Sequence, residues 1–208
     1  MGNIFVGLDP GGRDAFGWVV VNVERYPQVL AKGECSDVMT VIAEVEGNLS
    51  DQVEPVAVGI DAPLYWVYQR GRLADDYVRK LMPKGRSSTV ISVNSLRGAC
   101  LVQGVLAAKE VKQRWAQAKV TEAHPKALFE ISREARKWIK DLKLESEPSE
   151  HIRDAALAAF AAYAYWEKMA GWINLVSQEG GEPFFPSGYT AAYYFPEERN
   201  SFTFDAET

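Results

Sequence analysis

Three short strand-like runs that each end in an acidic residue, the first two of them mostly apolar, constrain the fold of this chain more than any other feature. They are Asn3–Asp9, Val56–Asp61 and Lys119–Glu122. Apolar runs of this length are typical of strands that are buried on both faces of a parallel sheet. The carboxyl ends of neighbouring parallel strands meet at one edge, about 4.8 Å apart from strand to strand. The sequence therefore predicts an α/β protein in which Asp9, Asp61 and Glu122 converge.

The segments between these runs predict the rest of a mixed sheet. Ala15–Val23 and Gln28–Glu34 have strand character, and short connections with Gly and Pro favour an antiparallel meander with the first run. Helical spacing predicts helices from a Ser36 cap to Val45, over 70–82, 96–118 and 125–144, and from a Ser149 cap through Glu150 to Met169. We expect a five-stranded sheet, made of the three-stranded antiparallel meander and parallel strands, flanked by helices.

The length of 208 residues suits one domain with a full hydrophobic core. We expect this domain to span residues 1–170. The extension over 171–208 is aromatic and Pro-rich without clear periodicity, and it is expected to pack on the same domain. The alternative is that its aromatic side chains form a surface for a partner. They are Phe184, Phe185, Tyr189, Tyr193, Tyr194 and Phe195.

The cysteine content and the hydropathy predict a cytoplasmic protein. Cys35 and Cys100 are the only cysteines, so the sequence implies no disulfide framework. The longest nearly uncharged run, Ala155–Trp166, is far shorter than the about 20 residues that span a bilayer. The N-terminus has no basic and apolar leader. We therefore expect no association with membranes.

The predicted convergence of carboxylates indicates a metal site. Like charges at a sheet edge repel one another, and a hard divalent cation such as Mg²⁺ or Mn²⁺ offsets this repulsion and assists phosphoryl transfer. Asp154 lies on the inward stripe of the last predicted helix, with His151 on the same face one turn earlier. The predicted metal ligands are Asp9, Asp61, His151 and Asp154, and the predicted catalytic residues are Asp9, Asp61, Asp154 and Glu122. The alternatives are turn caps for the aspartates and a structural role for Glu122 at a strand–helix junction.

The formal net charge of −5 argues against a nucleic-acid partner, but the charges are unevenly distributed. Residues 70–143 hold 17 basic and 7 acidic side chains, a net charge of +10, between segments of −7 and −8. A basic segment binds phosphate even in an acidic protein, because the local field decides what docks. The alternative is that these side chains belong to solvated helix faces. The predicted phosphate-binding residues are Arg70, Arg72, Arg79, Lys84, Arg86, Lys109, Lys112 and Arg114, with hydroxyl groups from Ser87, Ser88 and Thr89.

The stretch VGLDPGGRDAFGWVVVNV, from Val6 to Val23, resembles the first hairpin of the RNase H-like superfamily, especially its Holliday-junction resolvase branch. VGIDAPL at 58–64 is similar to the fourth strand of that fold, and HIRDAALAAFAAY at 151–163 to its last helix with a metal-binding aspartate. With TEAHPKALFE at 121–130, these motifs resemble an uncharacterised bacterial and archaeal family of predicted RNase H-like nucleases, over roughly residues 3–170. One departure is Asp61, where the resolvases usually have Glu.

The resemblance implies a metal-dependent nuclease that hydrolyses phosphodiester bonds of DNA or RNA by a two-metal mechanism. Asp9 would bridge both ions, Asp61 would hold one, and Asp154 with His151 the other, while Glu122 would be an outer ligand or orient a basic residue. Resolvases act as dimers, so a homodimer is one expected state. Two alternatives stay open: a nucleotide or phosphate-metabolite enzyme related to actin-like proteins and sugar kinases, with a phosphate loop at 9–12, and a non-catalytic binding module with the RNase H fold.

Overall fold

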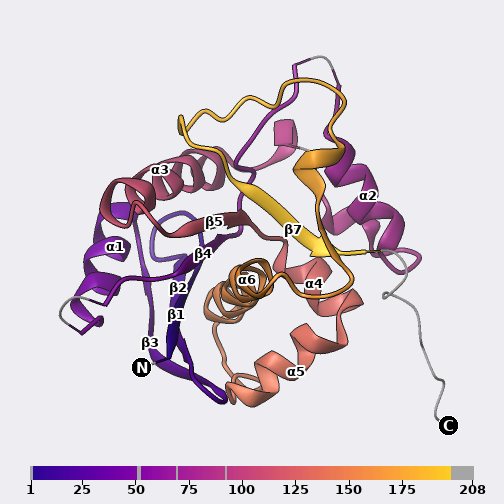
Figure 1. Cartoon of the computed structure of the whole chain (residues 1–208). Helices are drawn as coiled ribbons and strands as arrows, with labels where there is room; N and C mark the ends of the chain where they lie inside the picture. The colour runs from indigo at the N-terminus through magenta and orange to yellow at the C-terminus, as the bar shows by residue number, and fades with distance from the viewer. Residues whose placement is uncertain (1, 51–52, 69, 92, 198–208) are drawn as a thin grey trace, which may run out of the picture.

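The computed structural model describes residues 2–50, 53–68, 70–91 and 93–197, which form a sheet with helices on both faces (Figure 1). The helices are α1 (Val38–Gly47), α2 (Leu73–Leu81), α3 (Gly98–Arg114), α4 (Pro125–Ile131), α5 (Arg133–Asp141) and α6 (Glu150–Glu167). Short 3-10 helices are η1 (Ser87–Thr89), η2 (Val93–Ser95) and η3 (Leu175–Gln178). The strands are β1 (Asn3–Asp9), β2 (Phe16–Val23), β3 (Pro27–Cys35), β4 (Ala57–Ile60), β5 (Lys119–Glu122), β6 (Trp172–Asn174) and β7 (Ala192–Pro196).

The strands form one mixed sheet in the order β3-β2-β1-β4-β5-β7-β6. Strands β1, β2 and β3 are antiparallel neighbours, β4, β5 and β7 continue the sheet in parallel from β1, and β6 is antiparallel to β7. The predicted α/β fold class, an antiparallel meander plus parallel strands flanked by helices, is confirmed. The predicted number of five strands is wrong, because the C-terminal residues contribute β6 and β7.

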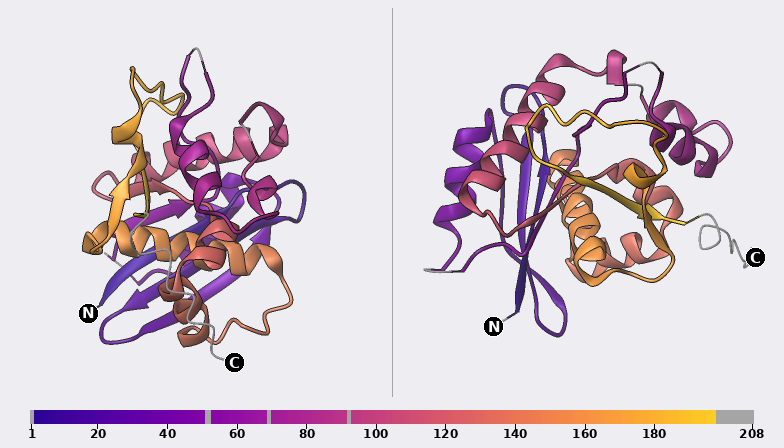
Figure 2. Two further views of the ribbon diagram at one scale, coloured as in Figure 1. Left: turned by 90° about the vertical axis from the view of Figure 1, so that its right-hand side faces the viewer. Right: turned by 45° about the horizontal axis from the view of Figure 1, so that its top comes forward.

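Two layers of helices bury the sheet on both faces. Helices α1 and α3 cover one face, and α4, α5 and α6 cover the other (Figures 1 and 2). Val20 of β2 packs against the core on the face covered by α1 and α3. Its neighbours Val19 and Val21 pack into the core on the opposite face, which is covered by α4, α5 and α6. This two-sided burial explains why the strands are continuously apolar. No helix in the described ranges combines the length and the apolar composition that a bilayer span requires.

Helix α6 lies very close to the sheet because glycine faces it on three strands. A Cβ built on Gly7 of β1 would lie 1.7 Å from a carbonyl oxygen of α6, and one on Gly59 of β4 would lie 1.9 Å from another. A Cβ on Gly17 of β2 would lie 2.3 Å from the carbonyl oxygen of His151. A side chain cannot be accommodated at such distances, so only glycine admits the helix backbone here. As a result, the first turns of α6 reach the end of β1.

Helices α2, α3 and α6 are shorter than predicted by one to four residues at an end, and two other helix boundaries differ for a local reason. The predicted helix over 125–144 is divided into α4 and α5, because Ser132 ends the first helix and its hydroxyl caps the second. Asp37 caps α1 in place of Ser36, since the Asp37 carboxylate accepts a backbone N–H of the first turn. Both serine and aspartate suit a cap, and the register of the helix decides which one serves.

The C-terminal segment extends the sheet beyond β5. Strand β7 pairs with β5 and buries Tyr193 and Phe195 in the core. Phe184 and Tyr189 are exposed. The backbone of Phe184 exchanges two hydrogen bonds of 2.8 Å with Trp66, so this segment also holds the loop that follows β4. The boundary at residue 170 stays a prediction.

Replacing Gly59 with alanine should destabilise the protein by about 3 kcal/mol, because the added methyl group collides with the backbone of α6. Urea-induced unfolding measures this change. Gly47→Ala is the matched control, since a Cβ on this exposed residue at the end of α1 meets nothing within 4 Å. The control should alter stability by less than about 1 kcal/mol. Equal effects of the two substitutions would contradict the close packing of α6.

Candidate active site

The carboxyl ends of β1, β4 and β5 lie level with one another at one edge of the sheet. Leu8 pairs with Ile60, and Ile60 pairs with Glu122. The N–H of Asp61, directly after β4, donates to the carbonyl oxygen of Leu8 over 2.8 Å. These pairings place Asp9, Asp61 and Glu122 on three consecutive strand ends.

Helix α6 adds His151 and Asp154 to this edge. The Ser149 hydroxyl caps the helix, which begins directly before His151. The ring nitrogen Nδ1 of His151 donates a hydrogen bond to Oδ2 of Asp9, with 2.7 Å between the two atoms. Asp154 follows on the same face, and both Asp9 and Asp154 are 8% exposed. Two segments from opposite ends of the sequence thus meet through the His151–Asp9 hydrogen bond.

The environment of these aspartates disfavours their charged form. Burial, and then the charge of Asp9, raise the pKa of Asp154 to about 7. Burial, followed by the charges of Asp9 and Asp154, raises the pKa of Asp61 well above its ordinary value. Burial also raises the pKa of Asp9, although the hydrogen bond from His151 opposes the effect. The same hydrogen bond raises the pKa of His151. The positive charge near the three aspartates is therefore too small to offset the effect of burial on their pKa values.

Lys126 is a cation at this site that the sequence analysis did not select. Its charge lowers the pKa of Asp9, Asp61 and Asp154. The Nζ atom lies 2.5 Å from Oε1 of Glu150, and this hydrogen bond raises the pKa of Lys126. A signal for Lys126 exists in the sequence, since it lies in the first turn of the helix that follows the acid-ended strand β5.

Glu122 is bound to an arginine rather than open toward the three aspartates. Its two oxygens accept hydrogen bonds from Arg72 at 2.7 and 2.8 Å, and Oε2 also accepts from the N–H of Leu64 at 2.9 Å. The same guanidinium donates to both oxygens of Asp75. Of the two roles predicted for Glu122, this geometry matches the orientation of a basic residue. The predicted placement of Arg72 on an exposed phosphate-binding surface is wrong, because Arg72 is 5% exposed and neutralises two buried carboxylates.

These residues line one cavity of about 650 Å³, which we call the carboxylate pocket. Its acidic and basic members are Asp9, Asp61, Arg72, Asp75, Arg97, Glu122, His124, Lys126, Glu150, His151 and Asp154. His124 was not among the predicted site residues. Burial, and then the charge of Arg72, lower the pKa of His124 to about 4, so its imidazole is neutral at pH 7.

The predicted phosphate-binding residues nearest this site lie on the loop that follows α2. Thr89 lines the carboxylate pocket, and Arg86 lines a groove beside it. Lys84, Ser87 and Ser88 are exposed on the same loop.

The other predicted basic residues have protein partners or lie further away. Arg79 donates to the carbonyl oxygen of Val90, and Arg70 is paired with buried Glu179 at 3.0 Å. Lys109, Lys112 and Arg114 follow Cys100, which lines the pocket, by roughly 14–21 Å along the axis of α3. The basic middle of the sequence is therefore not one continuous surface.

The donor set suits a hard divalent cation, although its side chains do not close around one point. Within the described residues, no group of three or more His, Cys, Asp or Glu side chains is positioned to hold a metal ion. Carboxylate oxygens are nevertheless the ligands that Mg²⁺ and Mn²⁺ prefer. The raised pKa values of Asp61 and Asp154 also indicate a lack of positive charge that such an ion would supply. The donor chemistry fits the ion, and joint coordination requires the side chains to rearrange.

Comparisons with known proteins place most of this chain in an uncharacterised family. Residues 7–160 match the model of a family described as "Protein of unknown function (DUF429)". This match confirms the predicted resemblance to an uncharacterised family. The structure described as "T. thermophilus RuvC in complex with Holliday junction substrate" is similar, with a TM-score of 0.47 and 17% sequence identity over 80% of this chain and 96% of that chain. No curated protein shows significant sequence similarity to this chain.

The Asp154 carboxyl is expected to lower the stability of the metal-free protein as the pH rises from 5 to 8, whereas the neutral imidazole of His124 contributes with the opposite sign. Asp154 has a pKa of about 7 in the folded protein, compared with about 4 in an unfolded chain. The stability linked to this proton is therefore complete below about pH 4 and is lost as the pH rises through about 7. This titration makes the free energy of unfolding on the order of 2–3 kcal/mol lower at pH 8 than at pH 5, and Asp154→Asn should remove that contribution.

Thermal unfolding in a chelator at pH 5 and pH 8 measures this effect. The variant should gain more in Tm at pH 8 than at pH 5. Asp141→Asn, which removes an exposed carboxylate of α5, should change the Tm at pH 5 and the Tm at pH 8 equally. An Asp154→Asn variant whose gain in Tm is the same at both pH values would contradict the raised pKa of Asp154.

Arg72→Met should destabilise the protein by about 3–5 kcal/mol, because it leaves Glu122 and Asp75 buried without a counter-charge. Adding Glu122→Gln to this variant should restore part of the loss. Arg79→Met serves as the control, since its ion pair with Asp76 is partly exposed and should contribute about 1 kcal/mol or less. Urea unfolding measures the three variants, and equal losses from the two arginines would refute the neutralising role of Arg72.

Proposed function

We propose that this chain, which belongs to the DUF429 family of proteins of unknown function, is a divalent-metal-dependent nuclease that hydrolyses phosphodiester bonds of nucleic acid. One observation carries the proposal: Asp9, Asp61 and Asp154, from two strand ends and a helix, share one cavity, where the charge of Asp9 raises the pKa of Asp154 and the charges of both raise the pKa of Asp61. Such repulsion destabilises the fold and is typical of functional sites. A hard cation accounts for it most simply.

In this proposal, Asp9, Asp61 and Asp154 hold Mg²⁺ or Mn²⁺. Asp9 and Asp61 would contribute ligands from the strand ends, and Asp154 with His151 would contribute them from α6. When bound, the ions supply Lewis-acid stabilisation of the phosphate that is cleaved. Asp61 has a shorter side chain than the glutamate usual in resolvases, so its ion is expected to be held more weakly.

The neighbouring groups orient the reactants. His151 fixes the rotamer of Asp9 through their 2.7 Å hydrogen bond. Lys126, whose side chain is 51% exposed, presents positive charge toward a phosphate oxygen and exchanges its contact with Glu150 for it. The neutral imidazole of His124, which lines the same pocket, is able to accept a hydrogen bond from water or a sugar hydroxyl.

Glu122 and Arg72 act at a distance from the reacting atoms. The Glu122 carboxylate accepts the N–H of Leu64, in the loop that starts with Asp61, and Arg72 holds that carboxylate in place. We infer that this pair keeps Asp61 at the edge of the pocket. Glu122 is therefore proposed as a positioning residue rather than as a ligand.

The kinase-like alternative has less support. Actin-like proteins and sugar kinases usually combine two such sheets, whereas the described residues form one. One of the two glycines in the turn at 9–12 also has a packing reason, because a Cβ on Gly11 would lie 1.9 Å from the carbonyl oxygen of Ala15.

Cleavage assays test the proposal directly. The protein is incubated with labelled single-stranded DNA, single-stranded RNA, a duplex and a four-way junction, in Mg²⁺, Mn²⁺ or a chelator. We expect metal-dependent cleavage of at least one substrate and a loss of at least about 100-fold in Asp9→Asn and Asp154→Asn. Mn²⁺ should also raise the Tm of the wild type and not that of Asp154→Asn.

Asp141→Asn on α5 is the matched control and should cleave as the wild type does. Cleavage that persists in both Asp9→Asn and Asp154→Asn would overturn the assignment of the site. ATP turnover without cleavage would favour the kinase-like alternative, and salt-sensitive binding of nucleic acid without cleavage would favour the binding module.

A further inference from the structure

A second cavity opens from the carboxylate pocket between α4 and α6. It has a volume of about 340 Å³ and shares Thr89, Lys126, Glu150 and Asp154 with the pocket. We call it the α4–α6 groove, defined by Arg86, Lys126, Phe129, Glu150, Arg153 and Asp154. Because Asp154 lines both cavities, a nucleic-acid strand bound in the carboxylate pocket can continue directly into this groove.

Three cations and three carboxylates line the α4–α6 groove, and the charge of Arg153 lowers the pKa of two of these carboxylates, Glu150 and Asp154. Arg86 lies 3.3 Å from Glu130, and Lys126 lies 2.5 Å from Glu150. Both pairs are more than half exposed at the cation, so each is weak and exchangeable. Within the described part of the chain, Arg153 has no carboxylate within the 4.0 Å of an ion pair. Its guanidinium is therefore available for a phosphate group without the loss of an existing pair.

Phe129 places an aromatic ring at the same groove. It lies on the outer face of α4 and is 44% exposed, although the other side of that helix is buried. An exposed phenylalanine next to cations offers a stacking surface for a nucleobase, and it carries no preference for one base over another. The spacing of Phe129 from Lys126, three residues along α4, puts the ring and the ammonium group on one side of the helix.

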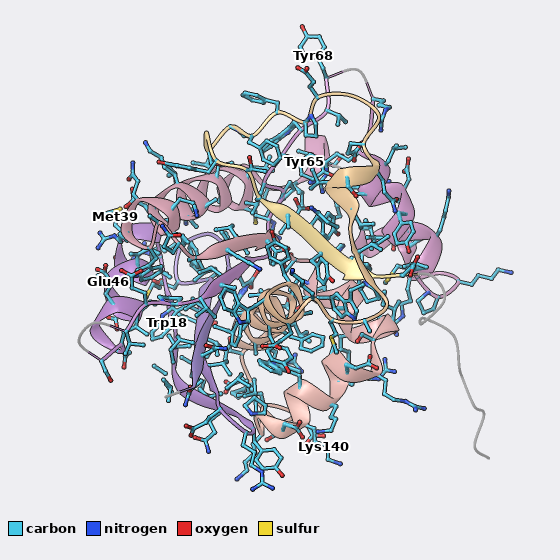
Figure 3. All side chains as sticks on the ribbon, in the orientation of Figure 1. Trp18, Met39, Glu46, Tyr65, Tyr68 and Lys140 are labelled. Atoms are coloured by element: carbon cyan, nitrogen blue, oxygen red, sulfur yellow. The ribbon has the colours of Figure 1, made fainter. Side chains whose placement is uncertain are left out.

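A larger cavity beside the loop that follows β4 is less suited to nucleic acid. It has a volume of about 1300 Å³ and is lined by Trp66, Tyr68 and Phe184 with aliphatic side chains of α3. Tyr68 projects away from the body of the protein (Figure 3). However, its cation Arg70 is paired with Glu179, and Glu182 adds a negative charge. The α4–α6 groove therefore offers a phosphate group a guanidinium without an ion pair in the described residues, that of Arg153, whereas the cation of this cavity is already paired.

We propose that the α4–α6 groove binds the nucleic-acid strand next to the phosphodiester bond that is cleaved, an inference that rests on the proposed function. Arg153 and Lys126 contact consecutive phosphates of that strand, and Phe129 stacks on the base between them. Stacking on Phe129 requires a base that is free from its partner strand. The substrate is thus a nucleic acid with unpaired nucleotides on one side of the cleaved bond.

Binding measurements in an inactive background test the groove. Asp9→Asn protein is titrated into a fluorescently labelled single-stranded 12-mer and into a blunt duplex of the same sequence, at several salt concentrations. Adding Arg153→Ala should weaken binding about tenfold and reduce the slope of log K against log salt by about 0.7. Adding Phe129→Ala should weaken binding of the single strand about tenfold and leave the duplex unchanged, and Phe129→Trp should restore it.

Matched controls lie elsewhere on the molecule. Arg25→Ala removes an exposed arginine in the β2–β3 turn, at the opposite end of the sheet, and Phe184→Ala removes an exposed aromatic from the other cavity. Both should bind as the parent does. The proposal would be overturned if Arg153→Ala bound the single strand as tightly as the Asp9→Asn parent. It would also be overturned if Phe184→Ala lost more affinity than Phe129→Ala.

Cleavage kinetics separate this proposal from the proposed function. In an otherwise wild-type background, Arg153→Ala and Phe129→Ala should raise KM with little change in kcat. Cleavage by the wild type with unchanged KM in both variants would refute the groove and leave the nuclease intact. Binding that depends on Arg153 and Phe129, without cleavage in any metal, would support the groove and refute the nuclease.

Discussion

The contact between the backbone of α6 and the glycines of the sheet is the constraint on which the rest of this structure depends. Gly7, Gly17 and Gly59 leave space that carbonyl oxygens of α6 occupy, and no other residue type fits at those distances. Alanines on the facing side of α6 are fully buried and keep the layers close. Because the helix lies so near, its first turns bring His151 and Asp154 into the space beyond the ends of β1 and β4. The site is thus a consequence of backbone packing.

This arrangement produces two kinds of buried carboxylate within one pocket. Glu122 and Asp75 share the guanidinium of Arg72, which supplies their hydrogen bonds and a counter-charge. Asp9 accepts the hydrogen bond from His151, the charge of Lys126 acts on all three aspartates, and the charge of Arg153 acts on Asp154. A fixed arginine makes the first group structural, whereas the shortage of positive charge leaves the second group free to bind a cation. Burial, and then the charge of Asp9, raise the pKa of Asp154 to about 7.

Much of the fold follows from local patterns. The acid-ended apolar runs predicted β1, β4 and β5 to within one residue at each end, and the Ser149 cap predicted the start of α6. The break at Ser132 and the strands β6 and β7 did not follow, because short elements in irregular sequence are stabilised by tertiary partners that no local window contains. Among the candidate site residues, the same patterns selected Asp9, Asp61 and Asp154. They failed for Arg72, since a count of charges along the chain does not distinguish an exposed arginine from one that is buried against two carboxylates.

The sequence by itself determined the class of the sheet, the acidic residues at three of its strand ends and the helix that carries His151 and Asp154. These are properties of residue spacing, because the periods of strands and helices are set by backbone geometry. Only the tertiary structure decided that Glu122 is paired with Arg72 and that the charge of Lys126 acts on the aspartates. It also placed Arg153 and Phe129 in the lining of the same α4–α6 groove. Those relations join segments far apart in the chain, and they are settled by the distances and charges that packing creates.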